Sequence, residues 1–249
     1  MPRAVVIGGL VALGLVTFLG FRPHQPWILI LAAAMTGLAV DGLVRSHPRW
    51  GETGSLASMP YLFLPVLVVL GSGLFIDSAI EGYSRPAAAL GCAAVAGFVA
   101  WGEYQTVDFA SRLYASVRLA LAIITYLTAF AFYTVIFNEN VDLPLAAFWV
   151  GLVSVLLSIE LLRESHLAGP SSPLVGLAIG VSVAELRLGL YFFPLDGLLA
   201  GALLIIGFYL ATGIVHHLLD HDLDVATAAE YAIVAIVGAG AVIVTRVFV

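Results

Sequence analysis

Lysine is absent from the sequence, and cysteine and charge are scarce. Only 10% of the 249 residues are charged, where soluble domains carry roughly 25%. So few charges cannot cover a water-facing surface, which argues against a soluble globular domain and against a disordered chain. The single cysteine, Cys92, excludes a disulfide within the chain and a metal site built from several cysteines. Ten arginines against 16 acidic residues give a net charge of −6, so we expect no nucleic-acid partner.

Hydrophobic residues make up 61% of the sequence and fall into long runs. A helix needs about 20 mostly apolar residues to cross roughly 30 Å of hydrocarbon. We therefore predict an all-α polytopic transmembrane bundle, with one integral membrane domain over residues 1–249 and the lipid bilayer as its main partner. The nine predicted spans are 4–21, 26–44, 59–80, 86–106, 111–137, 143–163, 172–192, 195–217 and 226–248. Eight spans is the alternative, because the first run is short and the junction at Phe193–Pro194 is tight.

Arginine placement predicts how these spans are oriented in a plasma membrane, because cytoplasmic loops carry an excess of positive charge. With nine spans, one side of the membrane has six arginines on or near it and the other side has three. The richer side holds the N-terminus, so we predict a cytoplasmic N-terminus and an external C-terminus. The six are Arg3, Arg45, Arg49, Arg112, Arg118 and Arg163, and the three are Arg22, Arg85 and Arg246.

Charges inside a span are costly and mark function by default. Glu185 and Arg187 lie well inside the seventh predicted span. Residues two apart on a helix point about 200° away from each other, so this pair does not neutralise itself on one face. We expect Arg187 to meet a partner on another helix, either Asp77 or Glu81. The alternatives are an ion pair that locks the bundle and a polar pathway or anion site.

Glu160 lies close to the end of the sixth predicted span. Arg163 follows it at the i, i+3 spacing that brings side chains together on a helix, and Glu164 follows it at i, i+4. The simpler interpretation is a charge network at the membrane surface. The alternative places Glu160 or Glu164 beside the histidine cluster of the next connection as an extra metal ligand.

The densest polar segment, residues 216–224, closes the eighth predicted span. If the helix continues, His217 and His221 share one face, and so do His216 and Asp220. Imidazole and carboxylate groups one helical turn apart can bind one divalent transition metal such as Zn, Fe, Mn or Ni. Glu230 is then a candidate further ligand or general base. The alternative is a solvated loop whose three aspartates suit the N-cap of the last helix.

Small residues are expected to mediate helix contacts, since lipid gives helices no hydrophobic drive to associate. The sequence has two G-x-x-x-G pairs, Gly176 with Gly180 and Gly197 with Gly201. Intramolecular packing is the simpler interpretation of these pairs. A face for a homo-oligomer or a membrane partner subunit is the alternative.

Three function classes remain open from these residues. The first is a transporter or channel-like protein for a small solute, ion or lipid, with Glu185 and Arg187 in its path. The second is a metal-dependent enzyme that acts on a lipid or prenyl substrate at the cytoplasmic surface. The third is an accessory or scaffold subunit without chemistry. We place the first ahead, because a buried charge needs more explanation than a polar loop.

Overall fold

A computed structural model describes residues 2–21, 25–51, 57–139, 141–163, 172–219 and 224–248. These residues form nine α-helices and no strand. The helices are α1 (Pro2–Gly20), α2 (Pro26–Arg45), α3 (Pro60–Ala79), α4 (Ser84–Gln105), α5 (Tyr114–Asn138), α6 (Leu143–Leu162), α7 (Ser172–Leu190), α8 (Gly197–Leu219) and α9 (Val225–Phe248). Each of the nine described helices is long and apolar enough to cross a membrane.

The chain divides into two compact units, Met1–Thr128 and Ala129–Val249, which we call the N-terminal and C-terminal units. The boundary falls within α5, so the first part of that helix belongs to the N-terminal unit and its last part to the C-terminal unit. The prediction of one domain over residues 1–249 stays a prediction.

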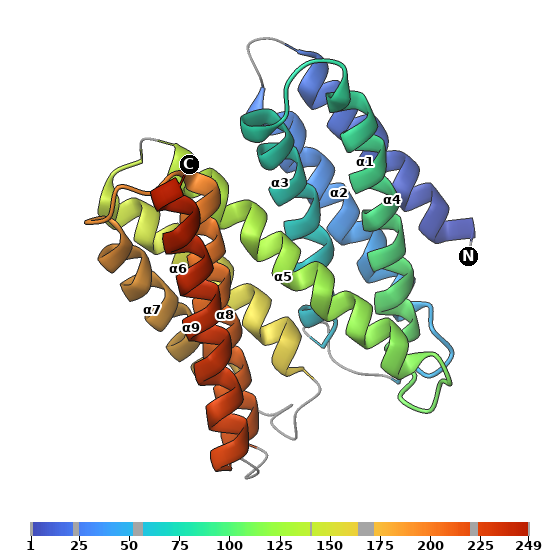
Figure 1. Ribbon diagram of the computed structural model, residues 1–249. Helices are drawn as coiled ribbons and strands as arrows, with labels where there is room; N and C mark the ends of the chain where they lie inside the picture. Colours follow the sequence, from blue (N-terminus) through green and yellow to red (C-terminus); the bar gives the residue numbers. More distant parts are fainter. Residues whose placement is uncertain are drawn as a thin grey trace. The chain divides into compact units, whose positions relative to one another are not determined.

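In the N-terminal unit, α1 to α4 lie side by side as a closed ring (Figure 1). Each helix packs on the next, and α4 returns to pack on α1. The α1–α4 contact is close because glycines meet there. A Cβ added at Gly8 would lie 3.2 Å from the carbonyl oxygen of Ala93, and one added at Gly97 would lie 3.2 Å from that of Ala4. Close backbone approach is what small residues permit at helix contacts in lipid.

The turn between α3 and α4 depends on one glycine and one arginine. Gly82 has a φ of 68°, in the left-handed region that favours glycine. Arg85 then donates hydrogen bonds to the carbonyl oxygens of Ile80 at 2.6 Å and of Asp77 at 3.1 Å. These oxygens would otherwise lack partners at the helix end. The arginine therefore stabilises the end of α3.

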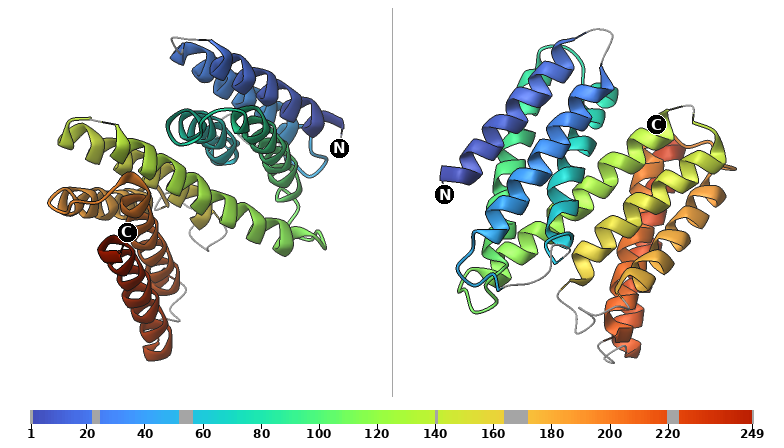
Figure 2. Two further views of the ribbon diagram at one scale, coloured as in Figure 1. Left: turned by 45° about the horizontal axis from the view of Figure 1, so that its top comes forward. Right: turned by 180° about the vertical axis from the view of Figure 1, so that it is seen from behind.

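In the C-terminal unit, α6, α7, α8 and α9 lie side by side (Figures 1 and 2). The closest contact is between α6 and α7, where a Cβ added at Gly180 would lie 2.7 Å from the carbonyl oxygen of Gly151. Gly176 faces the same helix, and Gly197 and Gly201 face Asn138 and Thr134 of α5. Both G-x-x-x-G pairs thus serve contacts within the chain.

The last helix, α9, is held less closely than the others. It packs on α8, where the Tyr231 ring lies 5.7 Å from that of Tyr209 and a Cβ added at Gly238 would contact Ile206. Its apolar side chains Ile236 and Val237 are more than half exposed. Most of its surface is therefore left for a hydrophobic environment.

Candidate functional site

The centre of interest in the C-terminal unit is Arg187, in the last turn of α7. Its side chain is buried, with 5% of the residue exposed. Its Nε and Nη1 atoms have no hydrogen-bond partner among the described residues. The guanidinium carbon instead lies 4.4 Å from the centroid of the Phe137 ring of α5. A buried cation is thus held by an aromatic face, which leaves donor capacity unused.

Packing of α7 on its neighbours explains why Arg187 points inward. Gly151 and Gly180 bring α6 and α7 into backbone contact and fix the rotation of α7. On the side of α8, the Leu186 side chain occupies the space that a Cβ on Gly207 would need. With α7 held in this way, Arg187 is buried while Glu185 is exposed. The two charges face different surroundings, as their spacing of two residues predicts.

Thr134 of α5 is a second buried residue with a polar atom, Oγ1, that is not hydrogen-bonded to a described residue. Its residue is fully buried, and its Oγ1 has no hydrogen-bond partner among the described residues. This is unusual within α5, where Thr125 and Thr128 donate to the carbonyl oxygens four residues earlier, both within 2.8 Å. Thr134 precedes Phe137 by three residues, so both lie on one face of α5. The Thr134 hydroxyl itself faces Gly201 of α8, where it would contact an added Cβ.

The neighbouring core is also polar, but its groups are paired. The Tyr133 hydroxyl and the Ser154 Oγ are 2.6 Å apart, and Ser154 also donates to the carbonyl oxygen of Val150 at 2.7 Å. The Tyr133 ring packs edge-on against Phe208 of α8 at 6.3 Å. These contacts join α5, α6 and α8 in the C-terminal unit.

A guanidinium group with free N–H donors suits the chemistry of anion binding. Its planar donors fit carboxylate and phosphate oxygens, and it keeps its charge even when buried. Electrostatic attraction to an anion is stronger away from water than in it. The two nitrogens of Arg187 that lack a partner among the described residues therefore have the chemistry that an anion would require.

The other predicted intramembrane charges have different surroundings. Arg187 forms no ion pair with a described carboxylate of its own unit, and its predicted partners Asp77 and Glu81 belong to the other unit. The Oδ1 atom of Asp77 lies 3.8 Å from Nη2 of Arg85. Glu81 is exposed in the turn after α3. The position of Arg187 within its helix also differs from the prediction. Because α7 ends at Leu190 rather than at residue 192, Arg187 lies closer to the helix end than the predicted span places it.

Glu160 forms the i, i+3 ion pair with Arg163 that their spacing predicts. It is buried, with 1% of the residue exposed, and its Oε2 accepts a hydrogen bond from Arg163 Nη1 at 2.9 Å. Glu164 lies outside the described residues. The ion pair is therefore the role that the structure gives to Glu160.

Half of the predicted metal ligands lie in the described part of the chain. His216 and His217 close α8 with ring centroids 6.1 Å apart, and the His217 ring lies 5.9 Å from that of Tyr231. Asp220 and His221 lie outside the described residues. Glu230 is exposed on α9. Within the residues that are described, no group of three potential ligands comes together, and the metal site stays a prediction.

Asp224 caps the last helix. Its Oδ1 accepts a hydrogen bond from the backbone N–H of Thr227 at 2.7 Å, the N-cap contact that was the alternative interpretation of this segment. The bond to the Thr227 backbone favours the charged carboxylate and holds the pKa of Asp224 below its usual value.

Two charged residues of the N-terminal unit are buried, although the sequence does not identify them as buried. Glu103 in α4 is fully buried, and Arg118 in α5 is 7% exposed. A Cβ added at Gly102 would contact both Val117 and Leu121, so the neighbouring residues Glu103 and Arg118 flank the same α4–α5 contact. In the sequence, both residues lie near helix ends, which suggests that they are solvated. The sequence feature that could have indicated burial is Gly102, a small residue beside Glu103 that permits close packing of α4 on α5.

The described residues, with nine helices and a buried arginine, define a class of protein rather than an activity: an all-α protein whose helices are long and apolar enough to span a membrane. A family model described as a protein of unknown function (DUF5656) matches residues 7–245. The match covers nearly the whole chain, which therefore belongs to this family. No curated protein and no solved structure matches the chain.

Proposed function

We propose that the protein is an integral membrane protein with nine membrane-spanning helices, an N-terminus in the cytoplasm and a C-terminus outside the cell. Helix lengths support the proposal. The candidate spans contain 18 to 25 residues, which at 1.5 Å per residue corresponds to about 27–38 Å, close to the thickness of the hydrocarbon. The excess of arginine on one side of the predicted topology supports the orientation.

We further propose that the protein binds a small anionic solute and carries it across the membrane, with Arg187 as the binding group. The observation that carries the proposal is that two guanidinium nitrogens, Nε and Nη1, have no hydrogen-bond partner among the described residues, on a residue that is 5% exposed. Burying a cation without a partner costs several kcal/mol unless the group is compensated. A chain keeps such a group at a cost in stability where function requires it.

The chemistry of the site supports an anion rather than a cation. Arg187 is positively charged, and the neighbour that its described contact gives it is the aromatic ring of Phe137. Glu185 is exposed, so its charge does not neutralise the guanidinium from within the core. A carboxylate, a phosphate or a halide would complete the hydrogen bonding of Arg187.

Flux through reconstituted protein tests this function. Liposomes containing purified wild-type protein, R187Q or R246Q would be loaded separately with chloride, inorganic phosphate or acetate, and release would be followed over time. R246Q is the matched control, because Arg246 is exposed and its Nε bonds to the carbonyl oxygen of Pro194 at 2.8 Å. We expect at least one anion to leave faster with wild type and R246Q than with R187Q. Equal release with all three proteins, or release no faster than from protein-free liposomes for every anion, would contradict the proposal.

A further inference from the structure

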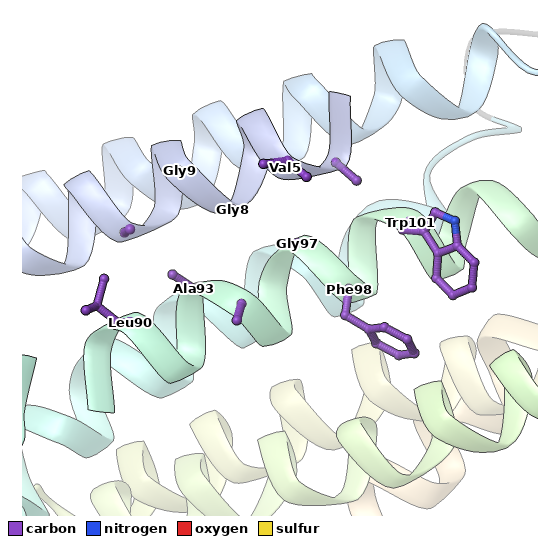
Figure 3. Close-up of a pocket in the computed structure, with 11 residues that line it drawn as sticks. Val5, Gly8, Gly9, Leu90, Ala93, Gly97, Phe98 and Trp101 are labelled. Carbon is purple, nitrogen blue, oxygen red and sulfur yellow. The ribbon is translucent and has the colours of Figure 1, made fainter. Parts of the chain in front are cut away.

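An apolar groove of about 610 Å³ runs along the contact between α1 and α4 in the N-terminal unit (Figure 3). Its floor consists of small residues, among them Gly8 and Gly9 of α1 and Ala93 and Gly97 of α4. Toward one end the side chains become aromatic, with Phe98 and Trp101. Figure 3 shows the glycines of α1 facing the small residues of α4 across this groove.

A second, more polar pocket of about 260 Å³ adjoins the aromatic end. The two pockets share the lining residues Ala4 and Trp101 and therefore adjoin there, and together we call them the depression. The polar pocket is also lined by Arg3, Ser46 and Tyr104. The depression therefore combines an apolar section with a section rich in hydrogen-bond donors.

Arg3 keeps most of its donors unused. Its Nη1 donates to Ser46 Oγ at 3.0 Å, and it forms no ion pair with a described carboxylate. No acidic side chain lines the pocket. At the other end of the same α1–α4 contact, a pocket of about 280 Å³ is also lined by an arginine, but Arg85 donates hydrogen bonds to the carbonyl oxygens of Ile80 and Asp77. Among the described residues, Arg3 at one end of the contact has no carboxylate partner, whereas Arg85 at the other end donates to two carbonyl oxygens.

The length of the groove distinguishes between two kinds of occupant. From Leu90 to Trp101 it extends over 11 helical steps, or about 16 Å. One leaflet of a bilayer contributes about half of a hydrocarbon thickness of roughly 30 Å. A transmembrane helix of a second chain would use a face along the whole thickness, whereas one acyl chain fits the length of a single leaflet. Tryptophan at the polar end is the residue type found where a membrane meets water.

We propose that this depression binds one anionic phospholipid, with an acyl chain in the α1–α4 groove and the phosphate at Arg3. The proposal rests on the membrane location given under the proposed function and is independent of the role of Arg187. The apolar floor accepts the chain, and Arg3 supplies the charge that complements the phosphate. The Trp101 indole N–H lies where the two sections meet and can donate to the lipid oxygens.

Glycine positions allow a matched pair of variants. A Cβ added at Gly9, in the groove, or at Gly91, elsewhere on α4, would meet no other atom within 4 Å. Gly9→Leu therefore fills the groove without a clash, and Gly91→Leu makes the same change outside it. Both exchanges improve helix propensity by a similar amount. Ala94→Phe fills the groove from α4 and serves as the second blocking variant if G9L does not fold.

Native mass spectrometry of the full chain in detergent tests the proposal, with phosphatidylglycerol and phosphatidylcholine of identical acyl chains as probes. We expect wild type and G91L to retain one phosphatidylglycerol per chain, and G9L and A94F to lose it. We expect R3Q, but not R112Q, to lower the preference for phosphatidylglycerol about fivefold, the contribution of one arginine near a membrane surface. Circular dichroism and size-exclusion chromatography confirm that each variant is folded.

Three results would overturn the proposal. The first is retention of the lipid by a folded G9L or A94F protein at the wild-type level, and the second is an unchanged lipid preference in R3Q. The third is a wild-type dimer that G9L or A94F converts to a monomer, since the groove would then be an interface between two copies. None of these results depends on anion flux, so a failure here leaves the proposed function of Arg187 standing, and the reverse also holds.

Discussion

The guanidinium carbon of Arg187 lies 4.4 Å from the centre of the Phe137 ring, and two of its nitrogens have no hydrogen-bond partner in the described part of the chain. The contact joins the last turn of α7 to the end of α5. A cation over an aromatic face contributes about 0.5–2 kcal/mol, which is less than the cost of burying a charge without an acceptor. Burial of Arg187 therefore lowers the stability of the folded protein.

Replacement of Arg187 by methionine is expected to stabilise the protein. Methionine has a similar length, needs no hydrogen bonds and packs well against aromatic rings. Loss of the desolvated charge should outweigh loss of the aromatic contact by about 1 kcal/mol, or roughly 2–4 °C in the midpoint of thermal unfolding. Thermal unfolding of R187M in detergent measures this, with R246M at an exposed arginine as the control. A lower midpoint for R187M than for wild type would show that the arginine is a structural group.

The α6–α7 contact should tolerate no added methyl group at Gly180. A Cβ there would lie 2.7 Å from the carbonyl oxygen of Gly151, and backbone cannot move aside as a side chain can. We expect Gly180→Ala to lower stability by about 1–3 kcal/mol, the usual cost of overpacking. Gly189→Ala, on the same helix with no atom within 4 Å of its added Cβ, should be neutral or slightly stabilising. Equal unfolding midpoints for the two variants would contradict the close contact.

Acid should weaken the start of α9 through Asp224. Its pKa is lowered by the bond from the Thr227 backbone, so its contribution is complete above the usual aspartate pKa and is lost as the pH falls through the lowered value. Hydrogen exchange of the first turn of α9, corrected for the intrinsic pH dependence, measures the loss. Asp224→Asn keeps an oxygen acceptor but does not titrate in this range, so its first turn should respond less to acid. The same response in both proteins would rule out the aspartate as the source.

The predicted orientation places the connections before and after α5 on opposite sides of the membrane. We expect a membrane-impermeant maleimide to label Glu139→Cys in intact cells, and Ala110→Cys only after the cells are permeabilised. Both positions are exposed, and the native Cys92 would first be replaced by serine. Labelling in the opposite order would reverse the orientation, and labelling of both in intact cells would remove the predicted crossing by α5.

The helices could be predicted from the sequence because the residues that mark their starts lie next to them in the chain. Pro26, Pro60 and Pro144 stand in the first turns of α2, α3 and α6, where the missing N–H costs nothing. The long apolar runs predict the extent of each helix. The nine predicted spans agree with the nine described helices to within a few residues at each end. Length and breaks in hydrophobicity are sufficient for this part of the fold.

The direction in which each charge points could not be predicted, because the helices are apolar on every side. An amphipathic stripe, which fixes the inward face of a soluble helix, is weak in α7, and contacts such as Gly151 with Gly180 set its rotation instead. The sequence therefore identified Glu185 and Arg187 without showing that only the arginine is buried. It also gave no reason to place Arg118 in the core rather than at the membrane surface.

Anion binding at Arg187 is tested most directly by the anion dependence of thermal unfolding. Wild type, R187Q and R246Q would be unfolded in detergent at rising concentrations of chloride, phosphate or acetate, so that effects common to all three proteins cancel. We predict a saturating rise in the midpoint for wild type and R246Q that R187Q lacks, corresponding to about 2.7 kcal/mol when the anion reaches 100 times its dissociation constant. The same rise in all three proteins with every anion would contradict the assignment of Arg187 as the anion-binding group.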